Sequence, residues 1–361
     1  MNMHKNMKRL TKMMRYRRAH NSNGERVFVK KFILPYKPSV FRDPVTQDIL
    51  AFVVDVADEN KVVPPMLWSC HVDTVHTMED SNKDFMQEVL YDEECAMFYK
   101  GDGKPLGADD AAGVWLLLEM IDAGVPGSYI FHRGEERGGI GSGGMADHHA
   151  AWLSQFSYAV AFDRRDNCSI ITEQAGGVCA SDKFALAFGD LLNGYDPEMI
   201  NLQPDPTGIF TDTANYRKLI PECTNISVGY DAEHTGGETL DALFLGALRD
   251  ALVGVFIDST TITSLPVERD PTKKDPVRDW SGYGKFDVSM GMDYDDEYER
   301  DYDRKYSKRG NRIKEPHSVE DVVNMRFSEV VDWVERGDPA KVADFILMMA
   351  EDMMYNTNVI N

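Results

Sequence analysis

Short apolar segments alternate with longer, partly apolar ones along the first 257 residues of the chain. Apolar runs of four to eight residues between turn residues are typical of buried strands, and longer amphipathic stretches are typical of helices. The expected strands cover residues 40–41, 49–56, 66–70, 128–131, 158–162, 169–173 and 226–229. The expected helices cover residues 10–17, 26–34, 114–123, 143–155, 182–193 and 240–256. This pattern indicates an α/β domain in which helices cover a sheet.

The pattern changes after residue 257. The segment that follows is rich in charged residues, proline, glycine and tyrosine, a composition that buries too little apolar surface to fold. Two amphipathic helices are then expected at 319–335 and 339–355. We therefore expect a domain over 1–257, an acidic linker over 258–318 and a C-terminal helical extension over 319–361. The two helices could dock on the first domain or bind a partner.

Composition narrows the classes of partner. The chain has 361 residues and a formal charge of −21, which argues against binding to a nucleic-acid backbone. No stretch reaches the length of a membrane span, and the basic N-terminus lacks the apolar core of a secretory signal. Five cysteines without paired spacing fit a reducing compartment. We therefore expect a cytoplasmic protein that contacts neither nucleic acid nor membrane.

Acidic residues and histidines stand at or just beyond the ends of several expected strands. Asp109 and Asp110 alone could be no more than the acidic first turn of a helix. However, similar residues recur at other strand ends, where α/β proteins bind ligands. The whole set consists of His71, Asp73, Asp109, Asp110, Glu135, Glu136, Asp163 and, in a loop, His234. Imidazole and carboxylate groups without a thiolate motif suit zinc or a similar divalent ion.

These residues, in this order, resemble the co-catalytic dinuclear-zinc exopeptidases, the superfamily of leucyl aminopeptidases, tripeptidases, glutamate carboxypeptidases and aminoacylases. The resemblance covers roughly residues 8–257. It implies a doubly wound three-layer α/β sandwich with a mixed, mostly parallel central sheet flanked by helices. In the carboxypeptidase branch a lid domain of about a hundred residues is inserted between the last two metal-ligand motifs. Here Asp163 and His234 are too close for such an insertion, so we expect no lid domain.

The resemblance also implies a role for each residue. His71 and Asp163 would bind one metal ion, Glu136 and His234 the other, and Asp109 would bridge both. Glu135 would be the general base, and Asp73 would orient His71. The two divalent ions, zinc by resemblance, would activate water for amide hydrolysis. The peptide bond between Asp109 and Asp110 would be cis.

Two classes of function stay open at this stage. The first is a metallo-exopeptidase, with an aminopeptidase preferred over a lidless carboxypeptidase, dipeptidase or N-acyl-amino-acid deacylase. The segment His234–Leu240 resembles the aminopeptidase branch, whereas His71–Val75 resembles the tripeptidase and carboxypeptidase branches. The substrate would be a peptide or an acyl-amino acid. The second class is a catalytically silent binding module, which Glu135 argues against because that residue binds no metal in the family.

Overall fold

The computed structural model describes residues 7–273, which belong to one compact unit. The rest of the expected linker and both C-terminal helices lie outside the described residues. Within them, no helix combines the length and apolar character needed to cross a membrane. All five cysteines are free thiols, and Cys70, Cys179 and Cys223 are buried.

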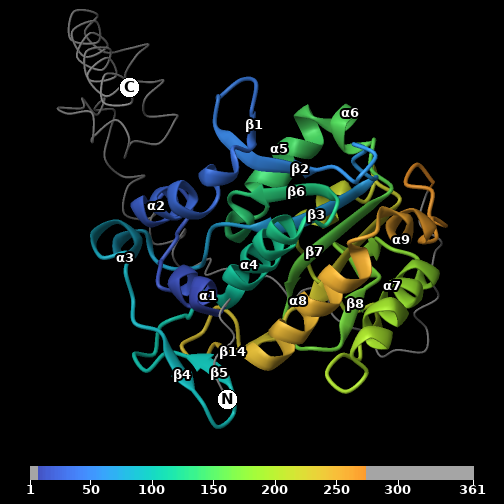
Figure 1. Cartoon of the computed structure of the whole chain (residues 1–361). Coiled ribbons are helices and arrows are strands. Elements are labelled where there is room, and N and C mark those ends of the chain that lie inside the picture. Colours follow the sequence, from blue (N-terminus) through green and yellow to red (C-terminus); the bar gives the residue numbers. More distant parts are fainter. Residues whose placement is uncertain (1–6, 274–361) are drawn as a thin grey trace, which may run out of the picture. The chain divides into compact units, whose positions relative to one another are not determined.

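An eight-stranded mixed sheet runs through the middle of this unit (Figure 1). Its order is β1 (Ser39–Arg42), β2 (Ile49–Val56), β6 (Gly127–His132), β3 (Met66–His71), β7 (Tyr158–Arg164), β12 (Glu222–Ser227), β8 (Ser169–Ile171) and β11 (Gln203–Asp205). The four central strands β6, β3, β7 and β12 are parallel to one another, whereas β2 joins β6 and β8 joins β12 in antiparallel pairing. The mixed central sheet is therefore as expected.

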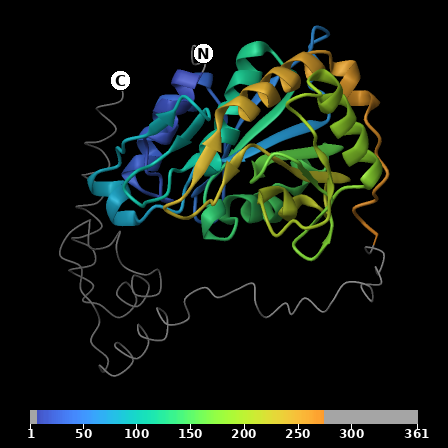
Figure 2. The same cartoon turned by 90° about the horizontal axis from the view of Figure 1, so that it is seen from below.

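Helices cover both faces of the sheet, as Figures 1 and 2 show. Trp68 and Phe162 pack into one core, with the helices α1 (Met7–Met14), α4 (Ala108–Ala123), α7 (Asp182–Tyr195) and α8 (Ala242–Phe256). Leu67 and Ala159 point the opposite way, into a second core beneath α5 (Ile140–His148) and α6 (Ala150–Leu153). Successive strand side chains alternate between the two faces, so fully apolar strands supply both cores. The three-layer α/β sandwich is confirmed.

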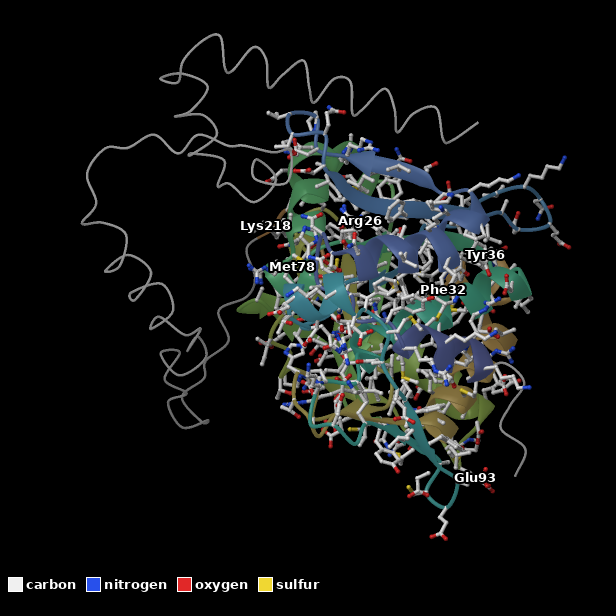
Figure 3. The ribbon with its side chains drawn as sticks, turned by 90° about the vertical axis from the view of Figure 1, so that its left-hand side faces the viewer. Arg26, Phe32, Tyr36, Met78, Glu93 and Lys218 are labelled. Atoms are coloured by element: carbon white, nitrogen blue, oxygen red, sulfur yellow. The ribbon has the colours of Figure 1, made fainter. Side chains whose placement is uncertain are left out.

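The remaining elements lie around the margins of the sheet. A second, four-stranded sheet has the order β13 (Tyr230–Asp231), β14 (Thr239–Asp241), β5 (Met97–Tyr99) and β4 (Leu90–Asp92). Figure 3 shows Glu93, between β4 and β5, at the far end of this hairpin, away from Arg26, Phe32 and Tyr36 of the N-terminal helical region. The other elements are α2 (Asn23–Phe32), η1 (Leu34–Tyr36), α3 (Met78–Lys83), η2 (Glu135–Arg137), β9 (Glu173–Gln174), β10 (Gly177–Val178), η3 (Asp212–Tyr216) and α9 (Ser259–Ser264).

The chain between Asp163 and His234 contains no inserted domain. It supplies α7 to one face of the sheet and β8, β11 and β12 to the sheet itself. The strand expected at 226–229 begins earlier, at Glu222. The first residues of this strand are polar, so the apolar pattern does not predict it. Glu222, Thr224 and Asn225 are nevertheless buried and hydrogen-bonded. The expectation of a lidless fold is confirmed.

The predicted end of the domain after residue 257 is too early. Residues 258–273 pack on the domain: Ile262 and Leu265 lie in its core, and the Tyr158 hydroxyl donates to the Leu265 carbonyl at 2.6 Å. The Arg269 side chain donates to the carbonyls of Val178 and Pro221 at 3.1 and 3.0 Å. Composition suggested a linker because an arginine that bonds to backbone carbonyls looks like any other charged residue in the sequence.

Replacing Ile262 by alanine should destabilise the protein. Ile262 is fully buried, and removing a buried isoleucine side chain costs about 2–5 kcal/mol. The matched control is Ile257→Ala, five residues earlier and 48% exposed, which should change the free energy of unfolding by only about 0.5 kcal/mol. Urea unfolding curves of both variants measure the difference. Equal stability of the two variants would show that this segment is a linker after all.

Candidate metal centre

The seven predicted site residues lie together at one edge of the main sheet. His71 ends β3, Asp163 lies near the end of β7, and Glu135 and Glu136 follow β6. These strands are parallel, so their carboxyl ends meet at the same edge. Asp109 enters this edge from the start of α4, and His234 reaches it from the loop between β13 and β14.

Asp109 lies between the two histidines and offers one carboxylate oxygen to each. Its Oδ1 is 3.0 Å from His71 Nε2, and its Oδ2 is 2.9 Å from His234 Nε2. His71 Nε2 is also 3.4 Å from Asp163 Oδ1, and His234 Nε2 is 3.2 Å from Glu136 Oε2. The five predicted ligands therefore form two groups that share Asp109.

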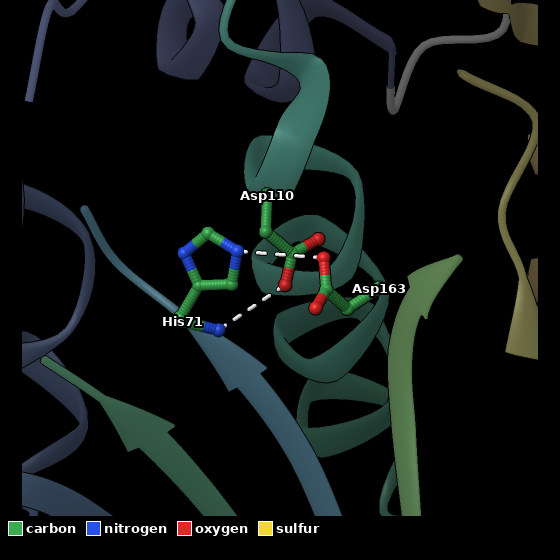
Figure 4. Close-up of side chains that lie close together, drawn as sticks. All are labelled: His71, Asp110 and Asp163. Atoms are coloured by element: carbon green, nitrogen blue, oxygen red, sulfur yellow. Dashed lines mark hydrogen bonds and ion pairs between the residues drawn. The ribbon is translucent and has the colours of Figure 1, made fainter. Parts of the chain in front are cut away.

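Asp110, the second acid of the pair, has a different environment. The peptide bond that joins it to Asp109 is cis, as the resemblance implied. Its Oδ1 accepts from the Gly113 amide at 2.8 Å, and its Oδ2 accepts from the His71 amide at 3.1 Å. Figure 4 shows this carboxylate beside His71 and Asp163, with its bond to the His71 backbone. Although its oxygens lie close enough to share an ion with His71 and Asp163, both are already used by backbone amides, which suits a helix cap.

Glu135 and Glu136 lie in a short 3-10 turn between glycines. Gly134 and Gly138 have φ angles of 76° and 83°, in the left-handed region that favours glycine. Asp73 Oδ1 accepts from the amides of Gly134 and Glu135 at 2.9 and 3.2 Å. The same oxygen is 3.7 Å from His71 Nδ1. Asp73 thus contacts both the histidine that it was expected to orient and the turn that carries the expected base.

Several residues beyond the seven predicted ones support the site. The Thr211 hydroxyl donates to Asp163 Oδ2 at 2.6 Å, and the Tyr230 hydroxyl donates to Asp163 Oδ1 at 3.0 Å. Glu238 is buried and accepts hydrogen bonds from four successive amides, those of residues 106–109. Each supporting residue is at least 48 residues from its partner along the chain, so no local sequence spacing predicts the contact.

Burial and mutual repulsion control the ionisation of the acids. Burial, with repulsion from Asp163 among other acids, raises the pKa of Glu135 well above its usual range. Burial, with repulsion from Asp109, raises the pKa of Glu136 to about 7. Hydrogen bonds to Asp109 and Glu136 raise the pKa of His234 to about 11. The carboxylates around the histidine nitrogens therefore favour a positive charge there.

The donor set fits divalent cations. The Glu136 Oε1 atom is buried without a hydrogen-bond partner, and the carboxylates of Asp109, Glu136 and Asp163 converge on two imidazoles. One ligand atom each of His71, Asp109 and Glu136 lies within 4.8 Å of the other two. Two histidines and three carboxylates are a nitrogen and oxygen set that suits zinc.

Several solved structures share this fold. A tripeptidase from Staphylococcus aureus has a TM-score of 0.57 and 13% identity, over 73% of this chain and 100% of its own. The aminopeptidase PepT from Bacillus cereus has a TM-score of 0.53 and 13% identity, over 71% of this chain and 98% of its own. A TET aminopeptidase from a marine sediment Thaumarchaeota archaeon has a TM-score of 0.52 and 12% identity, over 74% and 100%.

The likeness is one of fold. No family profile and no curated protein matches the sequence. At 12–13% identity the solved structures establish a common architecture, the one that the resemblance implied. What the chain does has to be argued from its own site residues.

Replacing Asp110 by alanine should lower stability more than the loss of a helix cap alone. The change removes the Gly113 cap and also leaves the buried His71 amide without its partner, a combined cost of about 1–3 kcal/mol. Asp241 caps α8 through the amides of Leu243 and Phe244 and provides the control Asp241→Ala. Urea unfolding with zinc present compares the two. A loss for Asp110→Ala no larger than for Asp241→Ala would contradict this role.

Proposed function

We propose that this chain is a dinuclear metal-dependent exopeptidase, specifically an aminopeptidase that hydrolyses the peptide bond after a free N-terminal residue. The observation that carries the proposal is the position of Asp109, whose two carboxylate oxygens each face a histidine that also lies close to a further acid. A carboxylate in this position can bridge two ions. His71 and Asp163 would hold one ion, and Glu136 and His234 the other.

Zinc is the proposed metal because the ligands are imidazoles and carboxylates. When bound, two such ions supply Lewis acidity, which lowers the pKa of water and polarises the carbonyl of the substrate. Asp163 would be oriented by the hydroxyls of Thr211 and Tyr230. Asp73 would hold the turn of Glu135 against His71.

Glu135 is the proposed general base. It is next to the ligand Glu136, and its backbone amide is tied to Asp73. Its carboxylate would accept a proton from the attacking water and donate that proton to the nitrogen of the leaving amine. A glutamate carboxylate can serve first as proton acceptor and then as proton donor in such a reaction. A binding module without catalysis has no need for this residue.

Three observations support an aminopeptidase over the alternatives. A carboxypeptidase must bind the carboxylate of its substrate, but three of the arginines near the site already pair with acids: Arg133 with Glu25, Arg164 with Asp205 and Arg165 with Glu233. The chain carries a formal charge of −21, which suits a substrate with a free amine. Solved structures of the same fold include proteins described as aminopeptidases.

The five free thiols support a reducing, cytoplasmic location.

Substituting the two adjacent glutamates should separate catalysis from metal binding. Glu135→Gln should keep two zinc ions per chain and lower kcat by about 10²–10⁴-fold, because the proton acceptor is lost. Glu136→Gln should bind fewer than two, because an amide is a poorer ligand than a carboxylate. Elemental analysis after dialysis against zinc, together with peptidase assays, measures both effects. Full activity in both variants, or a wild type that never binds two ions, would overturn the proposed mechanism.

Blocking the N-terminus of the substrate should abolish hydrolysis. The zinc-loaded protein should cleave aminoacyl anilides and amides that have a free amine, and it should not cleave their N-acetylated forms. The matched comparison uses the same peptides with blocked and free C-termini, for which we expect little difference. Faster cleavage of N-acetylated substrates would instead identify a deacylase or carboxypeptidase on the same metal centre.

A further inference from the structure

One buried carboxylate joins two segments of the site that are far apart in the chain. Glu238 Oε2 accepts from the amides of Leu106 and Gly107 at 2.8 and 3.0 Å, and its Oε1 accepts from those of Ala108 and Asp109 at 2.7 and 3.1 Å. Only 2% of Glu238 is exposed. A carboxylate has about four acceptor positions, so this one is saturated by backbone amides.

The amides that it binds belong to the segment that places Asp109. This segment leads into α4, where Gly107 is left-handed and residues 109 and 110 depart from helical angles. Such an irregular start leaves backbone donors without intrahelical partners. Glu238 supplies the missing acceptors, and charged acceptors make shorter and stronger hydrogen bonds than neutral ones. The carboxylate therefore fixes the backbone from which the Asp109 side chain projects.

The other end of the contact is the loop that carries His234. Glu238 is four residues beyond His234, in the connection between β13 and β14. His234 itself is 49% exposed at its side chain and has a φ of 64°, so its own packing holds it weakly. His234 Nε2 lies 2.9 Å from Asp109 Oδ2, on the segment whose amides Glu238 binds.

The two proposed metal positions differ in how they are held. His71 and Asp163 lie on the adjacent parallel strands β3 and β7, inside the hydrogen-bond network of the main sheet. Glu136 and His234 both lie outside that sheet, in a turn and a loop. The second position is therefore held by this turn and by the hairpin of β13 and β14 rather than by the main sheet.

We propose that Glu238 is a positioning residue that forms the second metal position by clamping the His234 loop to the Asp109 segment. This inference rests on the proposed dinuclear function and extends it. Glu238 contacts no ion and no substrate, and it acts through the backbone of Asp109 and the loop of His234. Loss of its carboxylate should weaken the second metal position more than the first, which shares Asp109 but takes its other two ligands from the strands of the main sheet.

The test is zinc affinity of the full chain, measured by competition with chelators of graded strength. In Glu238→Gln the second zinc ion should bind about 10–100-fold more weakly, the range found when a residue that supports a metal ligand is lost. The first ion should be weakened less, because only its shared ligand Asp109 depends on Glu238. Peptidase activity should then return at high free zinc, which a simple loss of folding would not allow.

Glu222→Gln is a matched control for a purely structural role. Glu222 is also fully buried, and its carboxylate accepts from the amides of Ser181, Glu268 and Arg269. It starts β12, at the opposite end of the parallel strands from the metal site, where it aligns with Tyr158 at the start of β7. We expect this variant to lose stability against urea while it binds both zinc ions normally. If Glu238→Gln does not fold, Glu238→Asp, which keeps the charge but shortens the side chain, replaces it.

The outcomes separate this inference from the proposed function. A wild type that binds two ions, together with a Glu238 variant that binds both equally tightly, would overturn the clamp and leave the peptidase proposal standing. Equal weakening of both ions would also overturn it, because the effect would not be selective. A wild type that binds fewer than two ions would overturn the dinuclear function and this inference together.

Discussion

The crowding of buried carboxylates at one sheet edge is the constraint on which the rest of the structure depends. Asp73, Asp109 and Asp110 are buried, and the Asp163 side chain is only slightly exposed. Burial, together with Asp163 and Asp109, raises the pKa of Asp110 well above its usual range. The protein offsets this charge with backbone amides, with hydroxyls and with the guanidinium of Arg18. That arginine is fully buried and donates to the Val72 carbonyl at 2.8 Å. Among the acids of the site, Asp110 has the strongest electrostatic interaction with it.

The fold makes such crowding possible because its parts differ in stiffness. The central parallel strands hold His71 and Asp163 between two apolar cores, so their positions follow from the packing of the whole domain. The turn that brings in Glu136 and the loop that brings in His234 lie outside the main sheet, and the His234 loop connects the paired strands β13 and β14. The turn of Glu136 is shaped by glycines with positive φ and by the amides that Asp73 binds. The His234 loop is joined to the Asp109 segment by the carboxylate of Glu238. A rigid sheet with adaptable loops at its carboxyl edge is a common design for active sites.

The similarity to known peptidases concerns architecture far more than sequence. At 12–13% identity, apolar strands between apolar helix faces are enough to preserve a three-layer sandwich, because many apolar residues can fill the same cores. A metal site tolerates much less substitution, since each ligand must place one particular atom within a few ångströms of the others. The agreement between the fold and the residues at its edge is therefore the basis for proposing a peptidase.

The sequence by itself determined the α/β class, the residue ranges of most main strands and the set of acids and histidines that meet at one edge of the sheet. It could do so because strands and helices have distinct apolar periods, and because these acids and histidines, in this order, resemble those of the dinuclear-zinc exopeptidases. It failed where a residue's role depends on a distant partner. Composition placed Ile262 in a linker, although it packs in the core. Nothing near Glu238 in the sequence indicates that its partners are residues 106–109. Only the tertiary structure decided that Asp109 faces the histidines while Asp110 caps a helix, because two adjacent carboxylates are identical until the fold gives them different neighbours.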